Sequence, residues 1–214
     1  MPRRLITERH VLEAAAAGRD TLLAPPGTLV TALARDAARA RGVRFVDAPP
    51  EDPAPGGEAP PTTLALGCDH AGFAYKDVLK AHAEGLGWTV TDVGTHAEAS
   101  VDYPDFAYAV ARLVQQGRCQ RGLVLDGVGV GSAIVANKVP GVRAALCPDV
   151  FSAYNARAHN DANVLTLGSR TMGVESCKRV LAEFLATPFE GGRHARRVQK
   201  VLDVEARFSG TGER

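Results

Sequence analysis

Short apolar runs alternate with amphipathic stretches along most of the chain after residue 62. Each apolar run is followed by a segment in which apolar residues recur at helical spacing. Strand and helix repeated in this order predict βαβ units, and therefore a parallel sheet with helices on both faces. We expect strands at 63–67, 88–94, 122–127, 142–147 and 163–168, and helices at 76–87, 104–116, 132–138, 149–158 and 174–186.

A proline-rich segment at residues 48–61 stands outside this pattern. Six of its fourteen residues are proline, two are glycine, and none is a large apolar residue. Such a composition is typical of an extended, semi-rigid linker. It divides the chain into an N-terminal extension, residues 1–47, and a main domain, residues 62–214.

The N-terminal extension is predicted to be small and helical. Thr7 and Thr31 each stand where a helix N-cap is expected, and Gly42 ends the second helix. Pro25-Pro26-Gly27 indicates a turn between the helices. Because the region holds few large apolar side chains, its own core is poor. It is either a marginal appendage or a docking module that completes its core on a partner.

The overall composition narrows the classes of function. Hydrophobic residues make up 45% of the 214, and the formal net charge of +1 argues against non-specific nucleic-acid binding or a polybasic membrane surface. The sequence contains neither a long apolar run nor a signal-peptide pattern, so we expect a cytoplasmic protein. The four cysteines form no Cys-x-x-Cys pair, which favours free thiols over a metal site.

Polar residues follow the predicted strands, where ligands of parallel sheets bind. We therefore expect carboxylates, histidines, arginines, a tyrosine and a glycine loop to converge on one edge of the sheet. Arginines and a helix N-terminus would hold a phosphate, and glycine amides would stabilise an oxyanion. The candidates are Asp69, His70, Tyr103, Asp126, Gly127, Gly129, Gly131, Arg143, His159, Asn160, Arg193 and Arg197.

Each of these features has an ordinary structural explanation when taken alone. A Gly-x-Gly-x-Gly loop is often only a tight turn, and His159 would suit a helix C-terminus. Arg193 and Arg197 are spaced to share one solvated helix face. The glycine loop also follows the third strand and lacks the Gly-x-Gly-x-x-Gly spacing, which disfavours a nucleotide-binding domain.

Five segments of the main domain carry a more specific signal together. They are GCDHAG (67–72), DYPDFA (102–107), GVGVGSAIVANKVPGVRAALC (127–147), ARAHNDANVLTLGSR (156–170) and EGGRHARRV (190–198). In order and spacing, this set resembles the ribose-5-phosphate isomerase type B and galactose-6-phosphate isomerase family. The resemblance implies a Rossmann-like α/β/α sandwich with a five-stranded parallel sheet. It also implies a homodimer or dimer of dimers with shared active sites, and an aldose–ketose phosphosugar isomerase that needs no metal or cofactor.

The resemblance further implies a division of roles among the candidates. Ring opening and proton transfer at the sugar oxygens fall to Asp69 and His159. Phosphate binding falls to His70, Arg193 and Arg197, with help from Arg143. Contacts with sugar hydroxyls and with the enediolate fall to Tyr103, Asn160 and the amides of Gly127 to Gly131.

The main departure from the family concerns the catalytic base. Most members carry a cysteine at the start of the glycine loop, where this chain has Asp126. Val128 replaces a threonine, and Ser132 stands where some members carry a glutamate base. Three interpretations are open. Asp126 is itself the base, the pocket is tuned to another phosphosugar or reaction, or the site binds without turnover.

The favoured reaction is the interconversion of ribose 5-phosphate and ribulose 5-phosphate through an enediolate. An isomerase of another phosphosugar and a non-catalytic phosphosugar-binding protein are the alternatives. A binding protein needs only the arginines and the glycine loop, whereas an isomerase also needs a working base.

The N-terminal extension is similar to short N-terminal segments of some proteins encoded with bacterial microcompartments. Those share an ITE-like opening and a later hydrophobic-T-P-x-A-R-D stretch, although Ala32 replaces the proline here. The similarity implies a targeting or assembly module, with shell or cargo proteins as partners and a location inside a microcompartment. The alternative is an extension that packs on its own dimer.

Overall fold

The computed structural model describes residues 5–24, 28–46 and 62–209. The expected linker at 48–61 and the expected turn at 25–27 therefore lie outside the described residues. The chain divides into two compact units, Met1–Glu58 and Ala59–Arg214.

The first unit contains the two expected helices, α1 (Glu8–Ala16) and α2 (Ala32–Arg41). Helix α1 follows Thr7, and the Thr31 hydroxyl caps α2 by accepting the Ala34 amide at 3.2 Å. Gly42 ends α2 with a φ of 68°, a left-handed conformation that glycine adopts readily. The capping residues predicted from the sequence therefore define both helices.

Four short strands of the first unit were not expected from the sequence. They are β1 (Leu5–Ile6), β2 (Thr21–Leu23), β3 (Leu29–Val30) and β4 (Arg44–Val46). Strand β1 pairs in parallel with β3, and β2 pairs in parallel with β4. The buried core beneath them is small, as expected, and consists of Ile6, Val11, Ala34, Ala38 and Val43.

The second unit is built on a five-stranded sheet in which every pairing is parallel. The strand order is β6-β5-β7-β9-β8. The bounds are β5 (Thr63–Cys68), β6 (Thr89–Asp92), β7 (Arg121–Asp126), β8 (Ala144–Leu146) and β9 (Val164–Gly168). The expected Rossmann-like sheet is confirmed.

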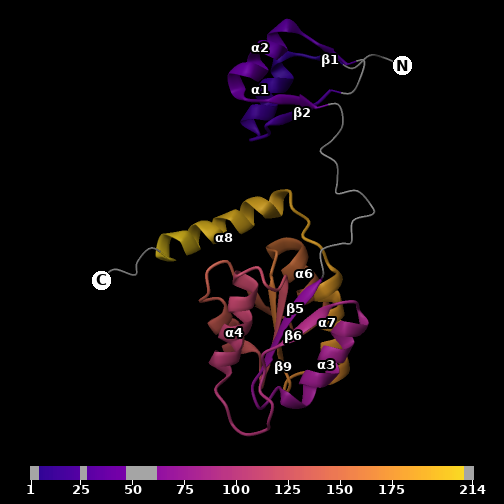
Figure 1. The fold of residues 1–214 in the computed structure, drawn as a ribbon, viewed down its shortest axis with the longest axis vertical. Coiled ribbons are helices and arrows are strands. Elements are labelled where there is room, and N and C mark those ends of the chain that lie inside the picture. The colour runs from indigo at the N-terminus through magenta and orange to yellow at the C-terminus, as the bar shows by residue number, and fades with distance from the viewer. Residues whose placement is uncertain (1–4, 25–27, 47–61, 210–214) are drawn as a thin grey trace. The chain divides into compact units, whose positions relative to one another are not determined.

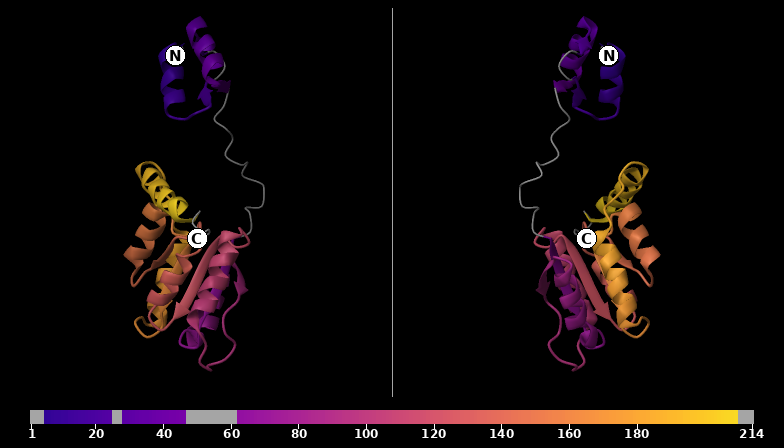
Figure 2. Two further views of the ribbon diagram at one scale, coloured as in Figure 1. Left: turned by 90° about the vertical axis from the view of Figure 1, so that its left-hand side faces the viewer. Right: turned by 90° about the vertical axis from the view of Figure 1, so that its right-hand side faces the viewer.

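Helices cover both faces of this sheet (Figures 1 and 2). One face carries α3 (Phe73–Gly85), α6 (Val150–Asn160) and α7 (Val174–Ala186), and the other carries α4 (Tyr103–Gln115) and α5 (Val130–Ala136). Side chains alternate along each strand to serve the two layers, so Leu64 and Leu66 pack under α3 while Ala65 packs under α4. Two separate apolar layers thus hold the sheet.

The order of the strands places a topological switch point between β5 and β7. Strand β5 is followed in sequence by β6 on one side, and the chain then crosses to β7 on the other side. Ligands of open parallel sheets bind at the carboxyl ends of the strands at such a point. Asp69 directly follows β5, and Asp126 ends β7.

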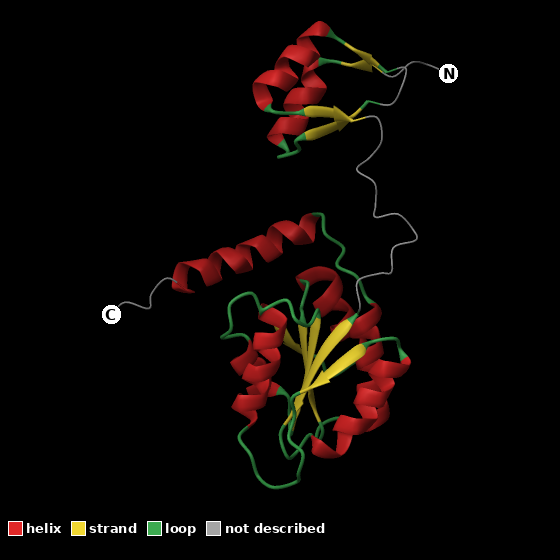
Figure 3. Cartoon of the chain, viewed as in Figure 1, coloured by secondary structure: helices red, strands yellow, loops and turns green. Residues whose placement is uncertain are grey.

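The last helix, α8 (Arg193–Ser209), was not among the predicted helices and lies next to α6 at one end of the sheet (Figure 3). Its apolar side chains Val201 and Val204 are both more than half exposed. Among the described residues, no helix combines the length and apolarity needed to cross a membrane.

Candidate active site

Asp69 organises the loop that follows β5. Its Oδ1 accepts hydrogen bonds from the amides of Ala71 and Gly72, at 2.9 and 3.0 Å, and its backbone amide donates to the Leu125 carbonyl. Gly72 must be glycine, because a Cβ there would lie 2.4 Å from the Leu125 carbonyl oxygen. The Asp69 side chain is buried, and its Oδ2 has no protein donor among the described residues. That oxygen is available to a substrate.

Asp126 organises the glycine loop in the same way but more completely. Its Oδ1 accepts from the amides of Val128, at 2.7 Å, and Gly129. Its Oδ2 accepts from the amide and hydroxyl of Ser132, at 3.2 and 2.5 Å. A carboxylate has about four acceptor positions, so this one is fully used. The aspartate in this glycine loop therefore has a structural purpose, since it pairs with N–H groups at and just before the start of α5.

Two glycines of the loop are required by close contacts. Gly129 has a φ of 86°, and a Cβ there would lie 2.5 Å from the Leu146 side chain. A Cβ on Gly131 would lie 2.7 Å from the ring of Tyr103. The loop therefore fits closely between the end of the sheet and Tyr103, which is partly exposed.

A cavity of about 410 Å³ opens over these groups. Its lining consists of Asp69, Tyr103, Asp126, Gly127, Val128, Val130 and Gly131. His70 follows Asp69 and is tied to the next loop, with its Nδ1 lying 3.3 Å from both the amide N and the carbonyl O of Val101. The structure thus brings seven of the predicted residues to one region: Asp69, His70, Tyr103, Asp126, Gly127, Gly129 and Gly131.

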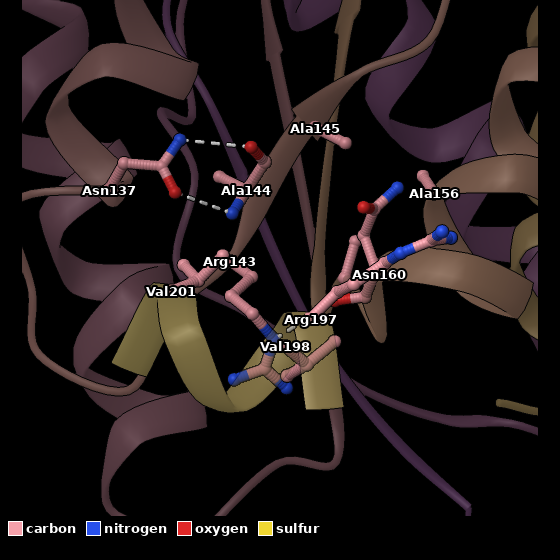
Figure 4. Close-up of a pocket in the computed structure, with 10 residues that line it drawn as sticks. Asn137, Arg143, Ala144, Ala145, Ala156, Asn160, Arg197, Val198 and Val201 are labelled. Carbon is pink, nitrogen blue, oxygen red and sulfur yellow. Dashed lines mark hydrogen bonds between the residues drawn. The ribbon is translucent and has the colours of Figure 1, made fainter. Parts of the chain in front are cut away.

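The remaining predicted residues form a second cluster. His159 and Asn160 end α6, Arg143 precedes β8, and Arg193 and Arg197 lie at the start of α8. Figure 4 shows Arg143, Asn160 and Arg197 around a second cavity, of about 290 Å³. Arg143 is held there by Asp161, with Nη2 lying 2.9 Å from the Asp161 Oδ2.

The two clusters lie at opposite ends of the strands, one at the carboxyl ends and the other at the amino ends. Asp126 pairs with Gly168 at the carboxyl end of β9, whereas Arg143 contacts Asn163 immediately before β9 begins. Five strand residues at ~3.3 Å each separate these ends by roughly 16 Å. The expectation that all candidates converge on one edge is therefore wrong for a single chain. The reason is geometric, because α6 runs back along the sheet and delivers its last residues to the other end.

The second cluster is centred on a pair of histidines. The rings of His159 and His194 are stacked, with centroids 4.0 Å apart and planes inclined by only 3°. Glu190 Oε2 lies 3.7 Å from the Nε2 atoms of both rings. Tyr154 donates its hydroxyl to Glu190 Oε1 at 2.7 Å, and this bond holds the pKa of Glu190 below its usual value. Glu190 is therefore an ionised neighbour of both imidazoles.

Sequence reasoning assigned no role to four residues that the structure places in these clusters. Ser132 was considered only as a missing glutamate, yet it contacts Asp126 directly. Arg170 follows β9, and its side chain lies beside Gly127 while its amide donates to the Gly127 carbonyl at 3.0 Å. Glu190 and His194 belong to the quoted motif EGGRHARRV, but nothing in its spacing shows which side chains meet.

The cysteines lie inside the protein, away from solvent. All four are buried and free. Burial raises the pKa of the Cys68 thiol to about 11 and that of Cys147 to about 12. These groups are therefore protonated at neutral pH and unsuited to act as a base.

Comparison with known proteins identifies the family to which the second unit is similar. Residues 64–201 match the family model described as Ribose/Galactose Isomerase. The chain is 42% identical over 144 residues to ribose-5-phosphate isomerase B of Escherichia coli. This alignment covers 67% of this chain and 97% of the relative. It is 41% identical over 140 residues to D-erythrulose-4-phosphate isomerase of Pectobacterium atrosepticum, covering 65% of this chain and 92% of the relative.

A solved structure gives the same result in three dimensions. Ribose-5-phosphate isomerase B of Clostridium thermocellum superposes with a TM-score of 0.67 at 43% identity, over 68% of this chain and 99% of that one. The residues that match the family model, 64–201, lie within the second unit and include both clusters. The chain therefore belongs to the ribose/galactose isomerase family of sugar-phosphate isomerases.

Proposed function

We propose that this chain interconverts ribose 5-phosphate and ribulose 5-phosphate. The proposal rests on the cavity at the switch point, where the open oxygen of Asp69, Tyr103 and the glycine loop line one space. Aldose–ketose isomerisation moves a proton between C2 and C1 through an enediolate, which the enzyme must stabilise. The names of the Escherichia coli and Clostridium thermocellum relatives support the choice of a five-carbon sugar.

Asp126 is the base in this proposal, and Ser132 must first release it. Three of the four donors to the carboxylate are backbone amides, so only the Ser132 hydroxyl leaves by a side-chain rotation. The freed Oδ2 accepts the proton, and the carboxylate loses its charge as the enediolate gains one. Replacement of Ser132 by alanine therefore leaves turnover unchanged or raises it. A loss of more than about tenfold in the folded variant would remove Asp126 as the base.

Hydrogen-bond donors for the enediolate oxygens line the cavity. Val130 and Gly131 open α5, and first-turn amides have no acceptor inside their own helix. Both residues line the cavity. Arg170, which is exposed and engaged in no ion pair among the described residues, adds a positive charge beside Gly127. These groups stabilise negative charge that develops at the reacting oxygens.

A second copy of the chain completes the site in this proposal. His159, Asn160, Arg193 and Arg197 cannot reach the cavity in one chain, because they lie at the other edge of the sheet. Exposed apolar side chains lie near both clusters. Val130 and Ile134 lie on α5, and Val201 and Val204 lie on α8. Covering these surfaces in a dimer would bring the His159 edge of one chain to the Asp69 cavity of the other.

Subunit complementation tests both parts of the proposal. Asp69→Asn and His159→Gln should each abolish turnover of ribose 5-phosphate in the homogeneous protein. Co-expressed at equal levels, they should form heterodimers with one intact and one doubly defective site. Random pairing makes half of the dimers mixed, so about a quarter of wild-type activity should return. No recovery in verified heterodimers would contradict the shared site, and an inactive wild-type protein would contradict the proposed reaction.

A four-carbon sugar phosphate is the second candidate. Val128, half exposed, presents an apolar wall in the cavity where the family usually carries threonine. A relative at 41% identity is named D-erythrulose-4-phosphate isomerase. Comparison of kcat/KM for ribose 5-phosphate and D-erythrulose 4-phosphate decides between the two. Calorimetric binding of both compounds without turnover would instead indicate a non-catalytic phosphosugar-binding protein.

The first unit, with the linker that follows it, is proposed to target the enzyme to a shell or enzyme assembly. Its support is a compact fold separate from the isomerase domain. Full-length protein should co-sediment with shell proteins, and a chain lacking residues 1–61 should not. Equal co-sedimentation of the two would contradict the proposal.

A further inference from the structure

His194 is a buried histidine that the proposed chemistry leaves without a role. It lies in the first turn of α8 and is only 5% exposed. Its ring faces that of His159 in parallel at 4.0 Å. A buried polar ring in direct contact with a reacting imidazole controls where that imidazole lies.

The hydrogen bonds around His159 define which of its nitrogens carries the proton. Asn160 Nδ2 donates to Asn155 Oδ1, which orients the Asn155 amide so that its Nδ2 donates to His159 Nδ1 at 2.8 Å. A neutral imidazole that accepts at Nδ1 carries its proton on Nε2. The Nε2–H therefore lies on the side of Glu190 and is the proton available for transfer.

The other neighbour of His194 is Arg193. Arg193 Nε donates to His194 Nε2 at 3.2 Å, which leaves the two terminal amino groups of the guanidinium outside this contact. A planar fork with its Nε–H fixed is oriented for bidentate binding of a phosphate. One imidazole thus contacts both the ring-opening residue and a phosphate-binding residue of the proposed site.

We propose that His194 is a positioning residue that aligns His159 for ring opening through its stacked face and Arg193 for phosphate binding through Nε2. This inference rests on the proposed function. It assigns to one side chain the relative placement of the groups that handle opposite ends of the sugar phosphate.

The charged surroundings of His194 keep its ring neutral, as both contacts require. Burial first, and then the proximity of His159, Arg193 and Arg197, hold the pKa of His194 below its usual value. Glu190 acts in the opposite direction. Tyr154, on α6, belongs to the surroundings of His194 through its hydrogen bond to Glu190. A neutral ring keeps a lone pair on Nε2 for Arg193 and avoids repulsion with a protonated His159.

The same side chains do not make a convincing metal site. The nearest ligand atoms of His159, Glu190 and His194 lie within 4.8 Å of one another, as metal ligands would. However, a metal must lie near the plane of each imidazole, and two parallel rings 4.0 Å apart have no common in-plane position. Arg193 also already donates to His194 Nε2. The arrangement fits a hydrogen-bonded stack.

Two substitutions separate the two contacts of His194. His194→Gln retains an acceptor for Arg193 but loses the flat ring, whereas His194→Phe retains the ring and loses the acceptor. We expect His194→Gln to lower kcat for ribose 5-phosphate by about 10- to 100-fold, as misplacement of a catalytic group does. We expect His194→Phe mainly to raise KM, by about tenfold, because a charge-assisted contact with phosphate is misaligned. Gln199→Ala, on the opposite face of α8, is the matched control.

Hydrogen exchange at C1 of ribulose 5-phosphate in deuterated water provides the decisive readout. This ketose has no ring to open, because its phosphate blocks the hydroxyl that would close a furanose. His194→Gln should therefore exchange C1 hydrogen far better than it turns over ribose 5-phosphate, which also shows that the variant is folded. Equal losses of exchange and turnover, or no loss of either, would overturn the role of His194. A wild-type protein without exchange and turnover would overturn the proposed function together with this inference.

Discussion

Replacement of Asp126 by asparagine should destabilise the isomerase domain as well as stop catalysis. The carboxylate is 5% exposed and accepts four hydrogen bonds from three residues of the glycine loop and α5. In the asparagine variant, the amide oxygen retains the bonds from Val128 and Gly129. The amide nitrogen then faces the Ser132 amide, donor against donor, while the Ser132 hydroxyl can rotate to accept. One buried N–H is left without an acceptor, and two bonds lose their charge assistance.

These losses convert to a measurable change in stability. A buried unsatisfied N–H costs ~1–3 kcal/mol, and each bond that loses a charged partner weakens by about 1 kcal/mol. The sum is roughly 3–5 kcal/mol, which lowers the melting temperature of a domain of this size by about 6–20 °C. Urea denaturation followed by circular dichroism measures the free energy of unfolding. Asp77→Asn, an exposed substitution on α3, is the control and should change it by less than ~0.5 kcal/mol.

The combination of stability and activity tests the reasoning. If Asp126→Asn unfolds at the same urea concentration as the wild type, the loop does not depend on the carboxylate and the geometric argument is wrong. Asp126→Cys restores the residue that most of the family carries at this position. It should be destabilised for the same reason, since a thiol accepts hydrogen bonds weakly.

Three further predictions follow from particular contacts. Gly131→Ala should lower kcat/KM at least tenfold in steady-state assays, because the new Cβ would lie 2.7 Å from the Tyr103 ring; unchanged kinetics would show that Tyr103 moves freely. Arg157→Met should cost ~2–5 kcal/mol in urea denaturation, because Arg157 is 1% exposed and its loss leaves the carbonyls of Thr187 and Ala162 without this donor; a cost below about 1 kcal/mol would contradict this. The pKa of His194 is lowered in the folded chain, so below pH ~6.5 the unfolded chain protonates this histidine more readily than the folded chain does. The melting temperature should therefore fall as pH drops from 7 to 5, and less so in His194→Gln; equal slopes would show that another group is responsible.

The sequence predicted the isomerase sheet well because most of its strands are apolar runs and each strand is followed by its own helix. Thr7, Thr31 and Gly42 likewise marked helix ends by local chemistry that needs no distant partner. The strands of the first unit are only two or three residues long and gain their identity from pairing with another part of the chain. Local patterns carry no information of that kind.

The candidate site was predicted only in part, for a related reason. Residue type and motif identified Asp69, Tyr103 and the glycine loop, because each follows a strand directly. His159 lies at the end of a helix, and the direction of that helix decides which edge of the sheet it reaches. The four donors to Asp126 could not be foreseen either, since they depend on the path of the loop from Gly127 to Ser132.

The placement of two half-sites at opposite edges has a consequence for symmetry. A two-fold axis that brings the Asp69 edge of one chain to the His159 edge of another also makes the reciprocal contact, so one pairing completes two sites. Such a pair has no half-site left over, and a third chain gains no active site by joining. The same two ends joined head to tail would complete every site only if the chains closed into a ring, and an open row would leave a half-site unused at each end. If the site is shared as proposed, a two-fold pair is therefore the smallest closed assembly that completes every site.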